Sequence, residues 1–182
     1  MLAQIARDHG NAPRAAELYE SALADRPTQL TWRLELAELH RSLGHPQQSL
    51  ELYGELIAAR PGDADLYVDR GVVLFQTGSL ERAEADFRSA LALDDALPEA
   101  SFNVGLLALQ SGREAEAERH LLRAVELRPG YGKAHYHLAR IYRGRGDPRA
   151  ALHAERATAA AEPPPGAVST PPPMAGTKEG GS

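Results

Sequence analysis

Three cationic side chains are spaced so that they could bind an anion together. Lys133 and Arg140 are seven residues apart, and Arg143 follows three residues later. Side chains at such spacings lie on one side of a helix, so the three would form a positive stripe. Guanidinium and ammonium groups bind carboxylates, and Tyr136 and His137 lie between them in the sequence. The pattern indicates a surface for an acidic segment or a chain-terminal carboxylate, provided that this stretch is helical.

Residues typical of metal sites and of catalysis are present but poorly spaced for either. His135 and His137 are two residues apart, so on a helix they point to different sides and are poor joint metal ligands. The chain has no cysteine, which excludes disulfides, thiolate metal sites and a cysteine nucleophile. Gly144-x-Gly146 lacks the third glycine and the preceding strand of a dinucleotide site. No Ser–His–Asp grouping occurs at an informative spacing. We therefore predict a protein that is not an enzyme, with no metal and no cofactor.

The tripeptide Arg145-Gly146-Asp147 matches an adhesion motif but also has a structural explanation. Gly146 suits a turn, and Asp147 suits the cap of a following helix. We favour the turn and the cap.

Composition narrows the classes of partner. The chain has 182 residues, a formal net charge of -5 and a pI of about 5.8. An acidic chain gains nothing from neutralising phosphates, so we predict no nucleic-acid binding. No apolar run is long enough to span a membrane, and the first residues lack the pattern of a signal peptide. We expect a cytoplasmic protein, and the alanine-, arginine- and leucine-rich usage suggests a bacterial source.

Glycine recurs at an interval of 34 residues through most of the chain. The members of this series are Gly10, Gly44, Gly78, Gly112 and Gly146. Two series of small residues and one of prolines keep the same interval: Ala3, Ala37, Gly71, Gly105 and Ala139; Ala15, Ser49, Ala83, Ala117 and Ala151; and Pro27, Pro61, Pro129 and Pro163. A period of 34 is the signature of stacked helix–turn–helix units.

The clearest unit, residues 64–97, shows how the series arise. Its pattern predicts helices over 64–76 and 80–93, joined by a turn at Gly78. Glycine ends a helix well because it adopts the left-handed conformation without a Cβ clash. Ser79 is placed to cap the second helix.

The small residues are expected to let the two helices of a unit approach closely. Gly71 and Ala83 would form this seam in the unit just described, with Phe87 filling the space beside them. A large side chain at Gly105 or Ala117 should then overpack the next seam.

The periodic part covers residues 1–161. We divide it into units of about 1–29, 30–63, 64–97, 98–131 and 132–161. Residues 162–182 contain six prolines and four glycines, and their apolar content is too low to pack. We expect a disordered tail there.

These series resemble the tetratricopeptide repeat family, in which Leu-Gly, Tyr, Ala, Phe, Ala and Pro stand at fixed offsets. The fourth unit supplies Val104-Gly105, Gly112, Ala117, Leu121, Ala124 and Pro129. The match covers five repeats, the first incomplete. The fifth has Glu155 and Thr158 where Phe and Ala are usual, and a polar outer face suits the last helix of an array. The resemblance implies an all-α, right-handed superhelical solenoid of antiparallel helix hairpins. Its concave groove would hold a peptide or helix of a partner protein.

The resemblance places the groove on one face of the first helix of each repeat. Its expected residues are Leu34, Glu35, Glu38, Val68, Asp69, Val72, Phe102, Asn103, Leu106, Lys133, Tyr136, His137, Arg140 and Arg143. Their charge changes from acidic to basic along the chain. We expect a peptide with an apolar anchor near Phe102 and an acidic or C-terminal carboxylate group against Lys133 and Arg140. Alternatively, the apolar members only pack neighbouring repeats and the charged ones form a solvated face.

Chaperone-binding members of the family grip a C-terminal carboxylate with five polar residues. Asn103, Lys133 and His137 occupy three of the matching positions here, and Val68 and Val72 occupy the other two. Apolar residues cannot bind a carboxylate, so the resemblance does not extend to a complete clamp.

Two functions follow from this reading. We favour a protein-interaction scaffold or adaptor, co-chaperone-like in its use of a groove. The alternative is a substrate-recruiting or regulatory segment of a larger enzyme or of a secretion or assembly machine. The oligomeric state and the identity of the partner do not follow from the sequence.

Overall fold

A computed structural model describes residues 2–159, and all of its regular structure is helical. The helices are α1 (Leu2–Asp8), α2 (Ala12–Asp25), α3 (Leu30–Ser42), α4 (Pro46–Ala59), α5 (Ala64–Gln76), α6 (Leu80–Leu93), α7 (Pro98–Gln110), α8 (Glu114–Leu127), α9 (Gly132–Gly144) and α10 (Arg149–Ala159). Within residues 2–159, none of these helices combines the length and the apolar character needed to cross a bilayer. The tail expected at 162–182 lies outside the described residues.

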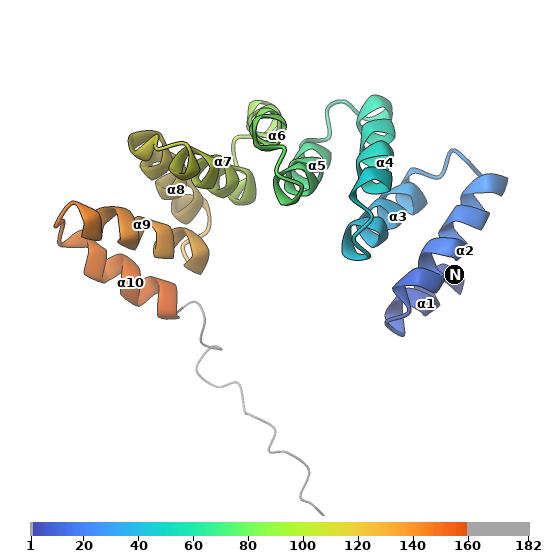
Figure 1. The fold of residues 1–182 in the computed structure, drawn as a ribbon, viewed down its shortest axis with the longest axis horizontal. Coiled ribbons are helices and arrows are strands. Elements are labelled where there is room, and N and C mark those ends of the chain that lie inside the picture. The colour runs from blue at the N-terminus through green and yellow to red at the C-terminus, as the bar shows by residue number, and fades with distance from the viewer. Residues whose placement is uncertain (1, 160–182) are drawn as a thin grey trace, which may run out of the picture.

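The helices form successive hairpins that stack into an open arc (Figure 1), with α1 at one end and α10 at the other. Each helix packs mainly against the helices before and after it in the chain. The expected all-α, right-handed superhelical solenoid is confirmed, and the two helices of the 64–97 unit have the predicted bounds.

The five periodic glycines end the first helices of the hairpins in the left-handed conformation. Their φ angles lie between 66° and 77°, and no other described residue has a positive φ. The residue after each glycine donates its backbone N–H to the carbonyl five residues earlier, as Ser79 does to Leu74 at 2.9 Å. This bond satisfies a carbonyl that the end of the helix would leave unpaired.

Side-chain capping of the second helices is less regular than expected. Asn11 caps α2, because its side chain accepts a bond from the N–H of Arg14 at 3.2 Å. The prediction for Ser79 is only half right, because Ser79 is the N-cap residue but its side chain makes no capping bond. His45 and Arg113 occupy the same position in other repeats. Neither makes a side-chain capping bond, so the first N–H groups of α4 and α8 receive no side-chain acceptor from these residues.

The small residues form the helix seams as expected. A Cβ built on Gly71 would lie 2.7 Å from the Phe87 ring, and one on Gly105 would lie 3.0 Å from Cγ of Leu121. Phe87 and Leu121 are fully buried. Each of these two seams is therefore closed by a large, fully buried side chain.

Replacing Gly105 with leucine is expected to lower the free energy of unfolding, on the order of 1–3 kcal/mol, because the new side chain overpacks the α7–α8 seam. Chemical denaturation measures the loss. Gly54→Ala is the matched control, because a Cβ at this helical glycine meets nothing within 4 Å. It should raise stability by about 0.5–1 kcal/mol. Unchanged stability of the Gly105→Leu protein would contradict the close approach at this seam.

A recurring hydrogen bond ties the first helix of a repeat to the proline before it. Different donors supply the bond at positions 34 or 68 residues apart, in each case to the carbonyl six residues earlier: Arg33 to Pro27 at 2.6 Å, Tyr67 to Pro61 at 3.2 Å and His135 to Pro129 at 2.8 Å. Ser101 holds this position in the fourth repeat, and its buried hydroxyl has no partner within residues 2–159. The sequence pattern did not reveal this series, because its donors are an arginine, a tyrosine and a histidine, which belong to different residue classes.

Candidate peptide-binding groove

The C-terminal part of the array contains a hollow of about 560 Å³ where α7, α9 and α10 meet. It is lined by Phe102, Tyr131, Gly132, Lys133, Tyr136, His137, Ala157 and Thr158. Four of these residues belong to the groove expected from the sequence, and the structure brings all four together. The hollow could accept an apolar side chain.

Aromatic rings form the floor and wall of this first hollow. The ring centroid of Phe102 lies 5.1 Å from that of Tyr131 and 5.9 Å from that of His137. Tyr136 meets His137 edge-on at 5.3 Å. Phe102 is only 8% exposed, whereas Tyr136 is 54% exposed. Phe102 therefore lies at the base, and Tyr136 offers a ring face that a ligand can cover.

A second hollow of about 420 Å³ adjoins the first, because His137 lines both. Its lining includes Leu106 and Leu109 of α7 and Arg140 of α9. Glu114 of α8 also lines it, and its carboxylate is paired with Arg145. Burial, and next the charge of Arg140, lower the pKa of His137 below its usual range. The Nδ1 atom of His137 is buried and has no hydrogen-bond partner within residues 2–159. A polar ligand atom between the two hollows could supply that partner.

The cationic stripe on α9 is exposed and carries no counter-ion from the described part of the chain. Lys133, Arg140 and Arg143 form no ion pair with any residue from 2 to 159. The guanidinium of Arg140 lies 5.9 Å from the centre of the Tyr136 ring. These charges are available to a ligand.

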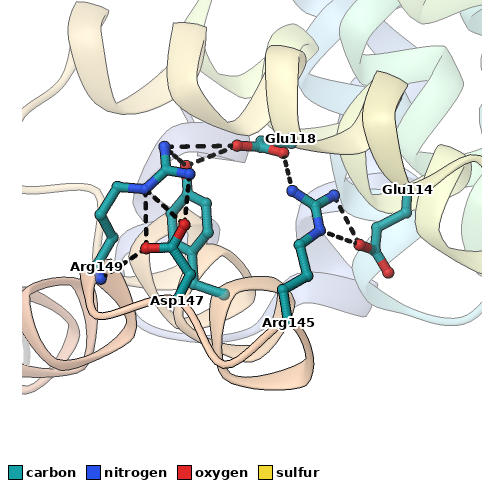
Figure 2. Close-up of polar contacts among 6 residues, drawn as sticks. Glu114, Glu118, Arg145, Asp147 and Arg149 are labelled. Atoms are coloured by element: carbon teal, nitrogen blue, oxygen red, sulfur yellow. Dashed lines mark hydrogen bonds and ion pairs between the residues drawn. The ribbon is translucent and has the colours of Figure 1, made fainter.

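The arginines of the following turn are arranged differently. Figure 2 shows Arg145 between Glu114 and Glu118, and Arg149 against Asp147. Arg145 Nη2 lies 2.6 Å from Glu114, and Arg149 Nη2 lies 2.7 Å from Asp147. Arg149 lowers the pKa of Asp147 to about 2. These guanidiniums are satisfied within the chain, in contrast to those on α9.

The same turn explains the Arg145-Gly146-Asp147 tripeptide. Gly146 has a φ of 66°, and the Asp147 carboxylate accepts the backbone N–H of Arg149 at 2.9 Å. The interpretation as a turn followed by a helix cap is confirmed.

The acidic residues expected in the N-terminal part of the groove differ in their surroundings. Glu35 on α3 forms an ion pair with Arg7 on α1, so it joins two repeats. Glu38 is exposed, whereas Asp69 on α5 is half-buried. Burial, reinforced by the charge of Glu38, raises the pKa of Asp69 to about 6. These groups form an acidic region separate from the two hollows.

The apolar groove residues of repeats 2 and 3 contribute to packing. Leu34 packs against the cluster around Tyr53 and Leu56. Val68 and Val72 pack against the cluster around Leu74 and Phe87. Because these three side chains are partly buried in the core, packing accounts for them. Leu106 packs against the core as well, but it also lines the second hollow. Asn103 lies half-buried next to Phe102 in the sequence.

The sequence pattern missed part of the first hollow. Tyr131 precedes α9, and Ala157 and Thr158 belong to the last turn of α10. None of the three lies on the first-helix face that the pattern identified. Only the antiparallel packing of α10 on α9 brings its end to the start of α9.

The repeat pattern is matched by a family model. The model described as tetratricopeptide repeat matches residues 1–44, 34–98, 92–132 and 102–167. The chain belongs to the tetratricopeptide repeat family. The array is therefore a scaffold of the kind that binds other proteins.

Individual relatives of this tetratricopeptide repeat array are distant. A mouse protein described as FK506-binding protein-like is 32% identical over 116 residues, which are 59% of this chain and 33% of the relative. The match thus spans about a third of the length of that curated relative. Among solved structures, MamA superimposes with a TM-score of 0.78 at 20% identity, covering 88% of this chain and 95% of MamA. PilF of Pseudomonas aeruginosa gives a TM-score of 0.77 at 20% identity, covering 87% and 73%. At this identity, the two structures show the shared fold alone.

Proposed function

We propose that the array is a non-enzymatic adaptor that binds a peptide segment of a partner protein across α7 and α9. One observation carries the proposal: an aromatic hollow adjoins a second hollow beside cations that have no counter-ion in the described chain. An apolar side chain of the ligand would enter the first hollow, over Phe102. An acidic group or terminal carboxylate would meet Lys133 and Arg140.

The chemistry of the site favours this occupant. Burying an aliphatic or aromatic side chain contributes about 1.5–3 kcal/mol. A carboxylate between guanidinium and ammonium groups adds charge-assisted hydrogen bonds and sets the orientation of the ligand. Because stacked hairpins hold both hollows in place, little ordering of the protein is needed on binding.

Reversing two charges tests the proposal. Lys133→Glu combined with Arg140→Glu should reduce capture of acidic partners at least tenfold, because attraction at two positions becomes repulsion. Affinity capture with quantitative mass spectrometry compares the variant with the parent protein. Thermal unfolding should be unchanged within about 0.5 kcal/mol, since both side chains are exposed and unpaired.

A charge-matched control separates the groove from net charge. Arg26→Glu with Arg82→Glu makes the same change of charge at two exposed positions outside both hollows. This control should capture the same partners as the parent protein. If the Lys133→Glu, Arg140→Glu protein captures the same partners as well as the parent protein does, the proposal is refuted.

The second candidate is a recruiting segment within a larger enzyme or assembly machine. It is supported by the mouse relative, in which the matched part is a third of the protein. Sequencing the surrounding reading frame tests this candidate. A continuous coding sequence for a catalytic or secretion segment would support it, and stop codons on both sides would refute it.

A further inference from the structure

A third hollow, of about 700 Å³, lies between α8 and α10 and shares no residue with the two hollows of the groove. Its lining includes Arg119, Leu122, Arg123 and Glu126 of α8, and His153 and Arg156 of α10. Three guanidiniums thus meet one carboxylate around a single depression.

The positive charge of this hollow is not balanced within the described chain. Arg123 pairs with Glu126 at 3.0 Å, but Arg119 and Arg156 form no ion pair with residues 2–159. Four other arginines, Arg88, Arg113, Arg145 and Arg149, each contact at least one carboxylate. An anion in the hollow would offset the repulsion between unpaired guanidiniums.

A buried imidazole adds a second, independent observation. His153 is only 6% exposed, and its Nδ1 is 2.8 Å from Nδ1 of His135. The Pro129 carbonyl can only accept, so His135 donates from Nε2 and its Nδ1 accepts the proton of His153 Nδ1. Nε2 of His153 then has no proton in the neutral ring and makes no hydrogen bond within residues 2–159. This atom is left for a ligand in the hollow that His153 lines.

We propose that this hollow binds a phosphate-class oxyanion through Arg119, Arg156 and His153. The two guanidiniums come from different helices and can each donate two bonds to a tetrahedral oxyanion. His153 takes up one proton at Nε2 as the anion binds and donates it in a hydrogen bond to the anion. Its Nδ1 proton continues to be donated to His135.

The charged groups around His153 support the uptake of a proton by this ring when the anion binds. In the free protein, burial, followed by the neighbouring His135, Arg156 and Arg149, lowers the pKa of His153. The Tyr142 ring of α9 lies 5.3 Å from the His153 ring, and Arg119, Arg123 and Glu126 of α8 line the same hollow as His153. An anion among these cations opposes their effect, so binding should raise the pKa of His153.

Nuclear magnetic resonance of the full chain tests the proposal with inorganic phosphate as the probe, at constant ionic strength maintained with chloride. We expect saturable shifts of the His153 ring signals and an upward shift of its titration midpoint. Arg119→Gln with Arg156→Gln should weaken binding at least tenfold. Arg82→Gln, at an exposed unpaired arginine of α6, should bind like the parent protein.

A second arm distinguishes free phosphate from a phosphate ester. O-phospho-L-serine that binds at least tenfold more tightly than phosphate would identify a monoester as the ligand, and the reverse order would identify the free ion. The proposal is overturned if phosphate moves the His153 signals no more than chloride does, or if the double variant responds like the parent protein. The site lies outside the groove, so neither result depends on peptide binding there.

Discussion

Replacing Asp86 with alanine is expected to lower the free energy of unfolding by about 3 kcal/mol. The two carboxylate oxygens of Asp86 on α6 accept hydrogen bonds from Arg70 on α5, at 2.7 Å each. The side chain of Asp86 is 8% exposed and that of Arg70 is 25% exposed. Removing the carboxylate would leave a largely buried guanidinium without its anion. Chemical denaturation at pH 7 measures the loss.

A double replacement with leucine should recover most of this stability. The positions 34 residues before Arg70 and Asp86 are Leu36 and Leu52, which pack in one apolar cluster. The fold therefore already accommodates two leucines at this seam. We expect the Arg70→Leu, Asp86→Leu protein to lie within about 1 kcal/mol of the parent protein, because an apolar pair can replace a buried ion pair.

An exposed ion pair provides the control. Arg14 and Glu17 are 2.6 Å apart, with side chains 58% and 62% exposed. Glu17→Ala should change stability by less than about 1 kcal/mol. If Asp86→Ala is no more destabilising than Glu17→Ala, burial does not set the strength of the Arg70–Asp86 pair.

The Arg70–Asp86 pair also shows why sequence periodicity predicts the fold but not all of its contacts. Glycines and small residues recur because every hairpin has the same turn and the same seam. Arg70 breaks an apolar series, and the series of Asp86 contains a second polar residue, His120. Only side-chain geometry joins Arg70 and Asp86 across the seam. A residue that differs from the rest of its series does not reveal what it contacts unless the residue opposite it across the seam is already known.

The part of the candidate groove that lies on a single helix was predictable from the sequence, because helical spacing decides which side chains share a face. Helical spacing places Lys133, Tyr136, His137 and Arg140 on one face of α9, and the structure keeps them there. Spacing within one helix cannot show that Ala157 lies beside them, because that depends on how α10 packs. Helical spacing also does not distinguish Val68, which packs against the core, from Leu106, which lines the second hollow, because burial depends on the neighbouring repeat.

The second large effect is a loss of stability on acidification, which we expect at the buried pair formed by His135 and His153. Their Nδ1 atoms are 2.8 Å apart and the rings are 0% and 6% exposed. This bond joins α9 to α10, and Nε2 of His135 is held by the Pro129 carbonyl. Charging the buried His153 ring costs desolvation at the contact between the two helices, so α10 should lose protection when this ring takes up a proton.

The direction of the effect follows from His153. Burial is the main cause that lowers its pKa in the folded protein. The unfolded chain therefore takes up a proton first, near pH 6.5, and stability falls as the pH drops below that value. The loss is at most about 1.4 kcal/mol per pH unit for one proton and ends below the folded-state pKa.

Hydrogen exchange between pH 7.5 and 5, expressed as protection factors, should show α10 losing protection before α5 and α6. A local measurement is needed because burial also lowers the pKa of His40, His120 and His137. His153→Asn keeps a donor for His135 but cannot titrate, so it should remove the pH dependence at α10. If α10 of the His153→Asn protein still loses protection below pH 6.5, another group sets the acid response of the terminal hairpin. If α10 loses protection in the parent protein but not in the His153→Asn protein, the acid response is assigned to the imidazole pair.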